Sequence, residues 1–329
     1  MKLLHYLIPI FFAAGLSASA QNIQTIPLQG AALLPESCNI NPINGDLYVG
    51  SSADGSIQKI SKGVVSWFSA ANANGMTAAS GMMVDVKKSR LWVCNMDIKD
   101  AVTGAASVNV FDLKTKKLLH SFHVPHDGLP HSLNDIVLDK NGNAYVTDSY
   151  SPIIWHASSD LKDLKVFVTN PIFTLDPKSF NLNGIVFTPD GKYIIASVAN
   201  ISGQTNNGDG LLFRISPITK EIVKVNFKNN GGGDGIGFAR DGALYTAMMR
   251  TGLSKVTFTN NYKDALAVIV SNSIAVKNAI KDAPTTARVF NNKLYVVNSQ
   301  FNYAFKGMNN YGNPFQPFVV SVIPISLLK

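Results

Sequence analysis

The sequence has few cysteines and few charged residues. Only Cys38 and Cys94 occur in 329 residues, and neither has cysteine or histidine neighbours at zinc-finger spacing, so a zinc site of that kind is not supported. Charged residues make up 15% of the chain, which is low for a cytosolic enzyme. The formal net charge of +8 is spread thinly, with adjacent basic pairs only at 87–88 and 116–117. Because a nucleic-acid partner requires clustered positive charge, we do not expect one.

Long hydrophobic runs are also missing after residue 20, so we predict no membrane span. Residues 1–20 have a different pattern, in which Lys2 precedes the apolar stretch LLHYLIPIFFAAGL and the small residues 18–20 precede Gln21. This arrangement is typical of a cleaved secretory signal peptide, although a buried N-terminal strand or helix is the alternative. We therefore expect cleavage after Ala20, export to the periplasm or the outside of the cell, and a single domain over residues 21–329.

Several catalytic motifs are absent from the sequence. There is no G-x-S-x-G elbow, which argues against a serine hydrolase of the common type. The glycine-rich stretch GGGDG at 231–235 has the spacing of neither a P-loop nor a dinucleotide-binding fingerprint. We instead expect these glycines to let the chain closely approach the channel mouth of the fold that the repeats below predict.

A pattern of about 50 residues is repeated six times along the chain. Each copy has a polar residue, a short apolar run, a tight turn and a second strand-like run. The clearest copies are NDIVLDKNGNAYVTDS, NGIVFTPDGKYIIAS and DGIGFARDGALYTAM, and the polar residue that opens each copy is called its marker. In chain order the markers are Glu36, Ser80, Asn134, Asn183, Asp234 and Thr285, separated by 44, 54, 49, 51 and 51 residues.

The turns and aromatic residues keep the same phase in these copies. The turns contain Asn-Gly, Asp-Gly, Ser89 or Asn-Asn, and such residues accept the positive φ angles of tight hairpins. Five of the six copies place a tyrosine or tryptophan at the same position of the second run, while the fourth has Ile194. Long helical periodicity is absent except briefly at 274–283. Six small meanders predict an all-β, six-bladed β-propeller, which residues 23–28 close by pairing near 318–325.

In a propeller the first strand of each blade lines the central channel, so the six markers are expected to form a ring at one mouth. Carboxylate and amide oxygens are the donors that Ca²⁺ prefers, and the ring contains both. The alternative is that each Asn or Asp caps its own turn. Because four acidic or amide residues share one phase, we favour a metal site, with Ca²⁺ or another divalent cation as cofactor.

The copies that begin at 134, 183 and 234 resemble the regucalcin/gluconolactonase family of six-bladed propellers, and the resemblance runs through nearly all of the chain after residue 20. It implies a divalent metal held by Glu36, Asn183 and Asp234, with Asn134 contacting the substrate and Asp234 also acting as general base. The sequence departs from the family at Ser132, where lactonases often carry an arginine. His131 either replaces the role of that arginine in binding substrate, together with Ser132, or is a surface-loop residue.

The sequence therefore supports two hypotheses of function. The first is an exported, calcium-dependent hydrolase of a lactone or related ester, acting on a small-molecule substrate as a monomer. The second is a non-enzymatic propeller that binds a ligand or protein at the mouth, with a structural metal. Cys38 and Cys94 either form a disulfide or remain free as buried thiols, and the free form is the favoured alternative.

Overall fold

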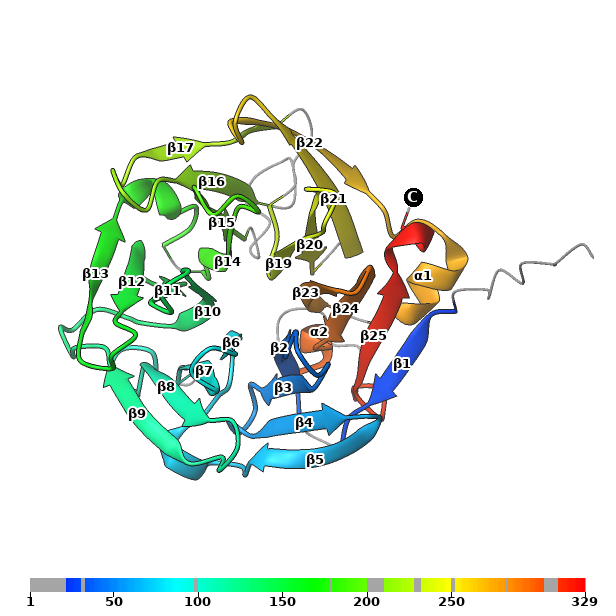
Figure 1. The fold of residues 1–329 in the computed structure, drawn as a ribbon, viewed down its shortest axis with the longest axis horizontal. Helices are drawn as coiled ribbons and strands as arrows, with labels where there is room; N and C mark the ends of the chain where they lie inside the picture. The colour runs from blue at the N-terminus through cyan, green and yellow to red at the C-terminus, as the bar shows by residue number, and fades with distance from the viewer. Residues whose placement is uncertain are drawn as a thin grey trace, which may run out of the picture.

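Six small sheets stand around a central axis like the blades of a propeller (Figure 1). The computed structural model describes residues 22–30, 33–97, 100–177, 179–199, 210–227, 232–249, 252–281, 283–304 and 313–328. The six-bladed all-β architecture predicted from the repeats is confirmed. The predicted signal peptide, residues 1–20, lies outside the described residues and stays a prediction.

Blades one to three are four-stranded antiparallel meanders, whose strands run in order from the channel outward. Blade one contains β2 (Pro35–Ile40), β3 (Leu47–Ser51), β4 (Ile57–Ser61) and β5 (Val64–Ser69). Blade two contains β6 (Met82–Asp85), β7 (Arg90–Asn95), β8 (Ser107–Asp112) and β9 (Leu118–His123). Blade three contains β10 (Leu133–Leu138), β11 (Ala144–Asp148), β12 (Ile153–Ala157) and β13 (Leu164–Thr169).

Blades four and five differ from this plan at their outer edges. Blade four contains β14 (Leu182–Phe187), β15 (Ile194–Val198), β16 (Leu211–Ile215) and the short β17 (Ile222–Lys224). Blade five contains β19 (Ile236–Phe238), β20 (Leu244–Met248), β21 (Gly252–Thr259) and β22 (Asp264–Ile269), and β18 (Asn226–Phe227) runs parallel to β22. The stretch 221–227 is therefore divided between two blades. Val225 is buried where the chain crosses, and its N–H donates to the carbonyl of Leu212.

Blade six closes the ring with strands from both ends of the described chain. It contains β23 (Pro284–Phe290), β24 (Lys293–Asn298), β25 (Val319–Pro324) and, outermost, β1 (Gln24–Pro27), which pairs antiparallel with β25. The predicted closure is confirmed, with Gln24 opposite Val322. It removes the exposed edges that an open row of blades would leave.

Helical structure is short and lies between strands. The helices are α1 (Ile274–Ala279) and α2 (Phe301–Ala304), and three 3₁₀ turns occur at Ala73–Gly75, Pro171–Phe173 and Ile325–Leu327. The first helix coincides with the one stretch of helical periodicity in the sequence. Within the described part of the chain, no helix has both the length and the apolar character needed to cross a membrane.

The repeated turns and aromatic residues occupy their predicted positions. Each inner hairpin turn contains a residue with positive φ, among them Gly191 at 69°, Ser89 at 53° and Asn292 at 57°. The aromatic rings pack between blades as well as within them. Tyr145 lies edge-on to Phe167 of its own blade at 4.9 Å and to Phe187 of blade four at 5.6 Å. The core is thus divided into layers that hold neighbouring sheets face to face.

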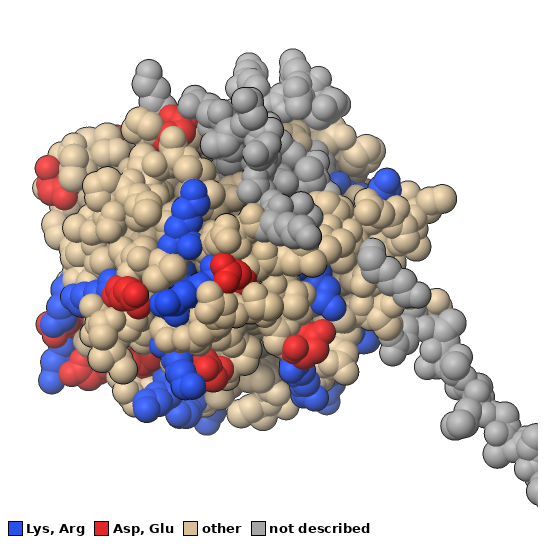
Figure 2. All heavy atoms as spheres, turned by 90° about the horizontal axis from the view of Figure 1, so that it is seen from above, with Lys and Arg blue, Asp and Glu red and all other residues tan. Residues whose placement is uncertain are grey.

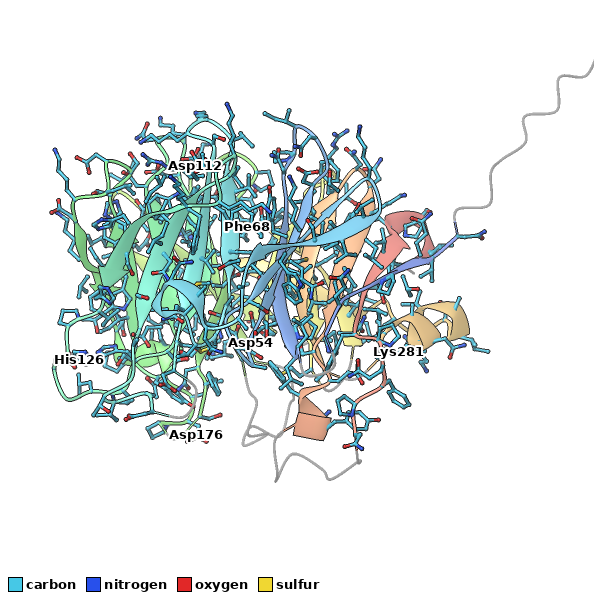
Figure 3. All side chains as sticks on the ribbon, turned by 90° about the horizontal axis from the view of Figure 1, so that it is seen from below. Asp54, Phe68, Asp112, His126, Asp176 and Lys281 are labelled. Carbon is cyan, nitrogen blue, oxygen red and sulfur yellow. The ribbon has the colours of Figure 1, made fainter. Side chains whose placement is uncertain are left out.

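The two ends of the ring can be told apart by their loops. Asp54, His126, Asp176 and Lys281 lie toward one end, and Asp112, the last residue of β8, lies at the other (Figure 3). Asp176 and Lys281 belong to connections that enter the innermost strands of blades four and six. The innermost strands therefore begin at the first end, which we call the mouth.

Charges of both signs are mixed on the side of the ring near β17 and β22. Figure 2 shows blue and red side chains interspersed there, without a continuous basic stripe among the coloured residues. Among the described residues, basic and acidic side chains also form ion pairs, such as Arg214–Glu221 at 3.1 Å and Lys192–Asp190 at 3.5 Å. On this side the thinly spread positive charge does not gather into a surface suited to nucleic acid.

Candidate functional site

The six markers occupy the beginning of the innermost strand of every blade. Four of them are the second residue of their strand, and Ser80 and Asp234 stand two residues before β6 and β19. All six side chains are buried: Glu36, Ser80, Asn134, Asn183, Asp234 and Thr285. The repeat thus places two carboxylates, two amides and two hydroxyls at corresponding positions around the mouth.

Hydrogen bonds from the preceding blade fix the backbone of this ring. Five of the six marker carbonyls accept such a bond, and blades one and two are joined by the Ala79 N–H donating to Ser51 O at 2.7 Å. The five donor–acceptor pairs are Thr285 Oγ1–Glu36 O (2.5 Å), Gly81 N–Asn134 O (2.5 Å), Thr147 Oγ1–Asn183 O (2.5 Å), Ser197 Oγ–Asp234 O (3.1 Å) and Gly235 N–Thr285 O (2.6 Å). The marker side chains are therefore mounted on a frame that is continuous around the channel.

Glycines next to two markers allow this close approach. A Cβ added to Gly235 would lie 2.7 Å from the carbonyl oxygen of Thr285 and 2.8 Å from the Cα of Thr286. A Cβ on Gly184 would likewise meet the carbonyl of Asp234. Because these neighbours are backbone atoms, they cannot move aside as a flexible side chain can. The glycine of each N-G or D-G pair at these two markers is thus required by packing between blades.

Glu36 and Asp234 are buried carboxyl groups with perturbed acidity. Burial raises the pKa of Glu36, and the negative charges of Asp234 and Asp135 raise it further, while Arg288 lowers it. Burial also raises the pKa of Asp234, and the charge of Asp135 adds to the effect. The charge of Arg288 does not offset burial and repulsion at Glu36, and a bound cation would add positive charge that stabilises the ionised forms of both groups.

Asn183 supplies a buried oxygen that is not hydrogen-bonded. Its side chain is 1% exposed, and its Oδ1 has no hydrogen-bond partner among the described residues. An unpaired buried acceptor is costly unless a ligand satisfies it. Two carboxylates and one amide oxygen fit a hard divalent cation such as Ca²⁺. Among the described residues, no three histidine, cysteine, aspartate or glutamate side chains form a metal-binding group by themselves.

The side chains of the other three markers differ in their hydrogen bonds. The hydroxyl of Ser80 donates to the carbonyl of Leu133 at 2.8 Å, and that of Thr285 is bonded to the Glu36 carbonyl and to Ser299 Oγ. These two hydroxyls therefore hold the frame together. Asn134 is 6% exposed, and no described residue forms a hydrogen bond with its side chain. It remains the candidate for contact with a substrate.

The structure adds a buried ion pair that the sequence interpretation missed. Arg288 Nη2 lies 2.6 Å from Asp135 Oδ1, with side chains 8% and 5% exposed. Asp135 directly follows the marker Asn134, and Arg288 lies three residues after Thr285. A signal was present in the sequence, because a charged residue inside an apolar innermost strand must find a partner when it is buried.

His131 and Ser132 are buried and form internal contacts. His131 Nδ1 lies 2.6 Å from Asp148 Oδ2, and its Nε2 lies 3.2 Å from Asp127 Oδ1. Burial would lower the pKa of His131, but hydrogen bonds and charges of the two aspartates outweigh it and raise the pKa. The Ser132 hydroxyl lies 2.7 Å from the sulfur of Met96. The surface-loop interpretation of His131 is therefore wrong, because its side chain packs beneath the loop between two carboxylates.

The two cysteines are buried and not bonded to each other. Cys38 packs in the core of blades one and six, and Cys94 packs in the core of blades two and three. Burial raises the pKa of Cys38 to about 12 and also raises that of Cys94. Both are thus protonated thiols that act as small apolar residues, and the disulfide alternative does not apply.

Comparison with known proteins supports the fold without fixing a family. Residues 77–228, less than half of the chain, match the Major royal jelly protein family. No curated protein matches the sequence. The regucalcin/gluconolactonase resemblance is supported at the level of the propeller fold only.

Several solved structures share this fold at low sequence identity. The major allergen Mala s 1 of Malassezia sympodialis has 16% identity and a TM-score of 0.68, with 91% of this chain and 95% of the allergen covered. A gluconolactonase from Xanthomonas campestris has 14% identity and a TM-score of 0.57, with coverage of 92% and 89%. Virginiamycin B lyase from Staphylococcus aureus has 13% identity and a TM-score of 0.58, with coverage of 84% and 82%.

Proposed function

We propose that the mouth binds a divalent cation, calcium by the chemistry of its donors, and hydrolyses a lactone or related ester there. The observation that supports this proposal is that Glu36, Asp234 and Asn183, whose Oδ1 is unpaired, are buried at equivalent positions of three blades. The shared fold with a gluconolactonase is consistent with it. Export, which would place the protein where calcium is abundant, remains part of the same proposal.

Each residue of the mouth has a distinct task in this reaction. A bound calcium ion would supply Lewis-acid polarisation of the substrate carbonyl. Asp234 accepts a proton from the attacking water. The Asn134 amide orients the substrate by hydrogen bonding. Glu36 and Asn183 hold their oxygens at the mouth on the hydrogen-bonded frame.

Metal content and turnover of the purified protein test this proposal together. We expect about one calcium per chain, a melting temperature that rises with calcium, and hydrolysis of at least one member of a lactone and ester panel that stops in EDTA. Asp234→Asn should lose both calcium binding and turnover. Asp160→Asn is the matched control, because Asp160 is an exposed carboxylate paired with Lys162. Hydrolysis that persists in Asp234→Asn with EDTA present would refute the mechanism.

A ligand-binding protein with a structural calcium is the second candidate. It is favoured by the internal bonds of His131 and Ser132, because these residues stand where substrate contacts were expected. This candidate predicts that calcium raises the melting temperature while no lactone or ester is turned over. The same panel therefore separates the two functions.

A further inference from the structure

The ion pair between Asp135 and Arg288 crosses the central channel. Asp135 belongs to β10 of blade three and Arg288 to β23 of blade six. In a six-membered ring these blades are opposite, and Figure 1 shows β10 and β23 on facing sides of the central opening. Their 2.6 Å contact therefore joins two sides of the molecule through its middle.

The same two side chains also reach the strands of the candidate metal ligands. Asp135 Oδ2 accepts a hydrogen bond of 3.2 Å from the N–H of Ile185, two residues after Asn183. Arg288 Nη1 donates a hydrogen bond of 2.7 Å to the carbonyl of Ile236, two residues after Asp234. The pair is thus part of the wall behind the mouth, although neither residue is a candidate ligand.

Four buried ionisable groups share this region. They are Glu36, Asp135, Asp234 and Arg288, each less than a tenth exposed. The negative charge of Asp135 raises the pKa of both Glu36 and Asp234, and the positive charge of Arg288 lowers the pKa of Glu36. The four groups are therefore close enough to influence one another. When all are ionised, three negative charges against one positive charge leave two negative charges. In a buried site with little water such an imbalance is weakly screened.

We propose that Arg288, by neutralising Asp135, holds the net charge of the mouth at minus two and thereby makes the site selective for a divalent over a trivalent cation. A divalent ion neutralises the four groups, whereas a trivalent ion of similar size leaves one buried positive charge. Without Arg288 the same groups carry three negative charges, which a trivalent ion matches. This inference rests on the proposed function, because it concerns the ion held by Glu36, Asn183 and Asp234.

The ratio of calcium affinity to terbium affinity tests the inference. Both dissociation constants are measured on the full chain, by calorimetry for calcium and by competition using terbium luminescence. In Arg288→Met we expect the ratio to shift toward terbium by about tenfold or more, since one positive charge is lost. Asp135→Asn should shift it toward calcium. The double variant restores two negative charges and should return to within about threefold of the original ratio.

Two further variants separate the effect of the Arg288 charge from effects of altered geometry or folding. Arg288→Lys keeps the positive charge but loses the forked geometry, so its ratio should stay at the original value even if both affinities fall. Arg214→Met is the matched control, because Arg214 is also a buried arginine, paired with Glu221 at 3.1 Å in blade four. If Arg288→Met does not fold, the nearly isosteric Asp135→Asn and Arg288→Lys still test the inference.

The outcomes distinguish this inference from the proposed function. If the unmodified protein binds calcium and no variant changes the ratio, the charge role of the pair is overturned and the metal site stands. A ratio that changes equally in Arg288→Lys and Arg288→Met would also overturn it, because the cause would then be geometry. If the unmodified protein binds neither ion, the proposed metal site fails and this inference fails with it.

Discussion

Substituting alanine for Gly235 tests how tightly the blades are packed at the mouth. The new Cβ would lie 2.7 Å from the Thr285 carbonyl oxygen, 2.8 Å from Thr286 Cα and 3.0 Å from Thr286 Oγ1. Ordinary contacts of this kind begin near 3.4 Å, so blades five and six must separate by more than half an ångström. Overpacking of this kind typically costs about 1–3 kcal/mol. The 2.6 Å bond from Gly235 N to Thr285 O would be strained too, adding about 1 kcal/mol.

We therefore expect Gly235→Ala to lower the free energy of unfolding by about 2–4 kcal/mol, measured by urea denaturation in EDTA. Because Asp234 precedes this glycine, calcium affinity should also fall by about tenfold or more, as when a support of a metal ligand is lost. Gly242→Ala is the matched control in the same blade. Gly242 has a φ of 81° and no atom near its missing Cβ, so its alanine variant should lose about 1 kcal/mol and keep its calcium affinity. Equal urea midpoints and equal calcium affinities for the two variants would refute the packing argument.

Three other measurements follow from the site and the turns. In EDTA the free energy of unfolding should fall as the pH rises above about 4 to 4.5, because the folded protein keeps protons on Glu36 and Asp234 that the unfolded chain releases. Calcium should reduce this fall. A free energy of unfolding in EDTA that rises over this pH range would contradict the prediction. Asn183→Leu removes an unpaired buried oxygen, so it should gain about 1 kcal/mol in EDTA and lose its calcium response; a calcium-dependent melting temperature in this variant would exclude Asn183 as a ligand. Ser89→Gly should relieve a φ of 53° and gain about 0.5 kcal/mol without changing calcium affinity; a lower urea midpoint would show that the serine is not strained.

The fold could be predicted because the turns and strands of each copy of the repeat are determined mainly by residues close together in the sequence. Asn-Gly and Asp-Gly turns, and an aromatic residue three positions later, depend on neighbours in the sequence and on one adjacent blade. The phase of these features located the start of every innermost strand. Even Ser89, which lacks the favoured glycine, keeps the positive φ of its turn because the strands on either side are already paired.

The site was only partly predictable, because its electrostatics depend on contacts across the ring. Asp135 and Arg288 are 153 residues apart and belong to opposite blades, so no spacing in the sequence relates them. Arg288 also lies outside the three clearest copies of the repeat, in a copy whose opening marker is a threonine. His131 was ambiguous for a similar reason, since its partner Asp148 lies at the end of β11, the second strand after His131 along the chain.

The pairing of β1 with β25 has a consequence for the order of events during synthesis. Gln24 is synthesised early, but it cannot pair until Val322, its partner in the last strand, has also been synthesised. Until then the first and sixth blades lack their shared contacts, among them the bond from Thr285 to the Glu36 carbonyl. Because such distant contacts are costly to form, closure is expected to be a late and slow step. A growing chain therefore carries all the oxygens of the mouth before it can hold them in a ring, and the proposed ion site would be complete only with the last strand.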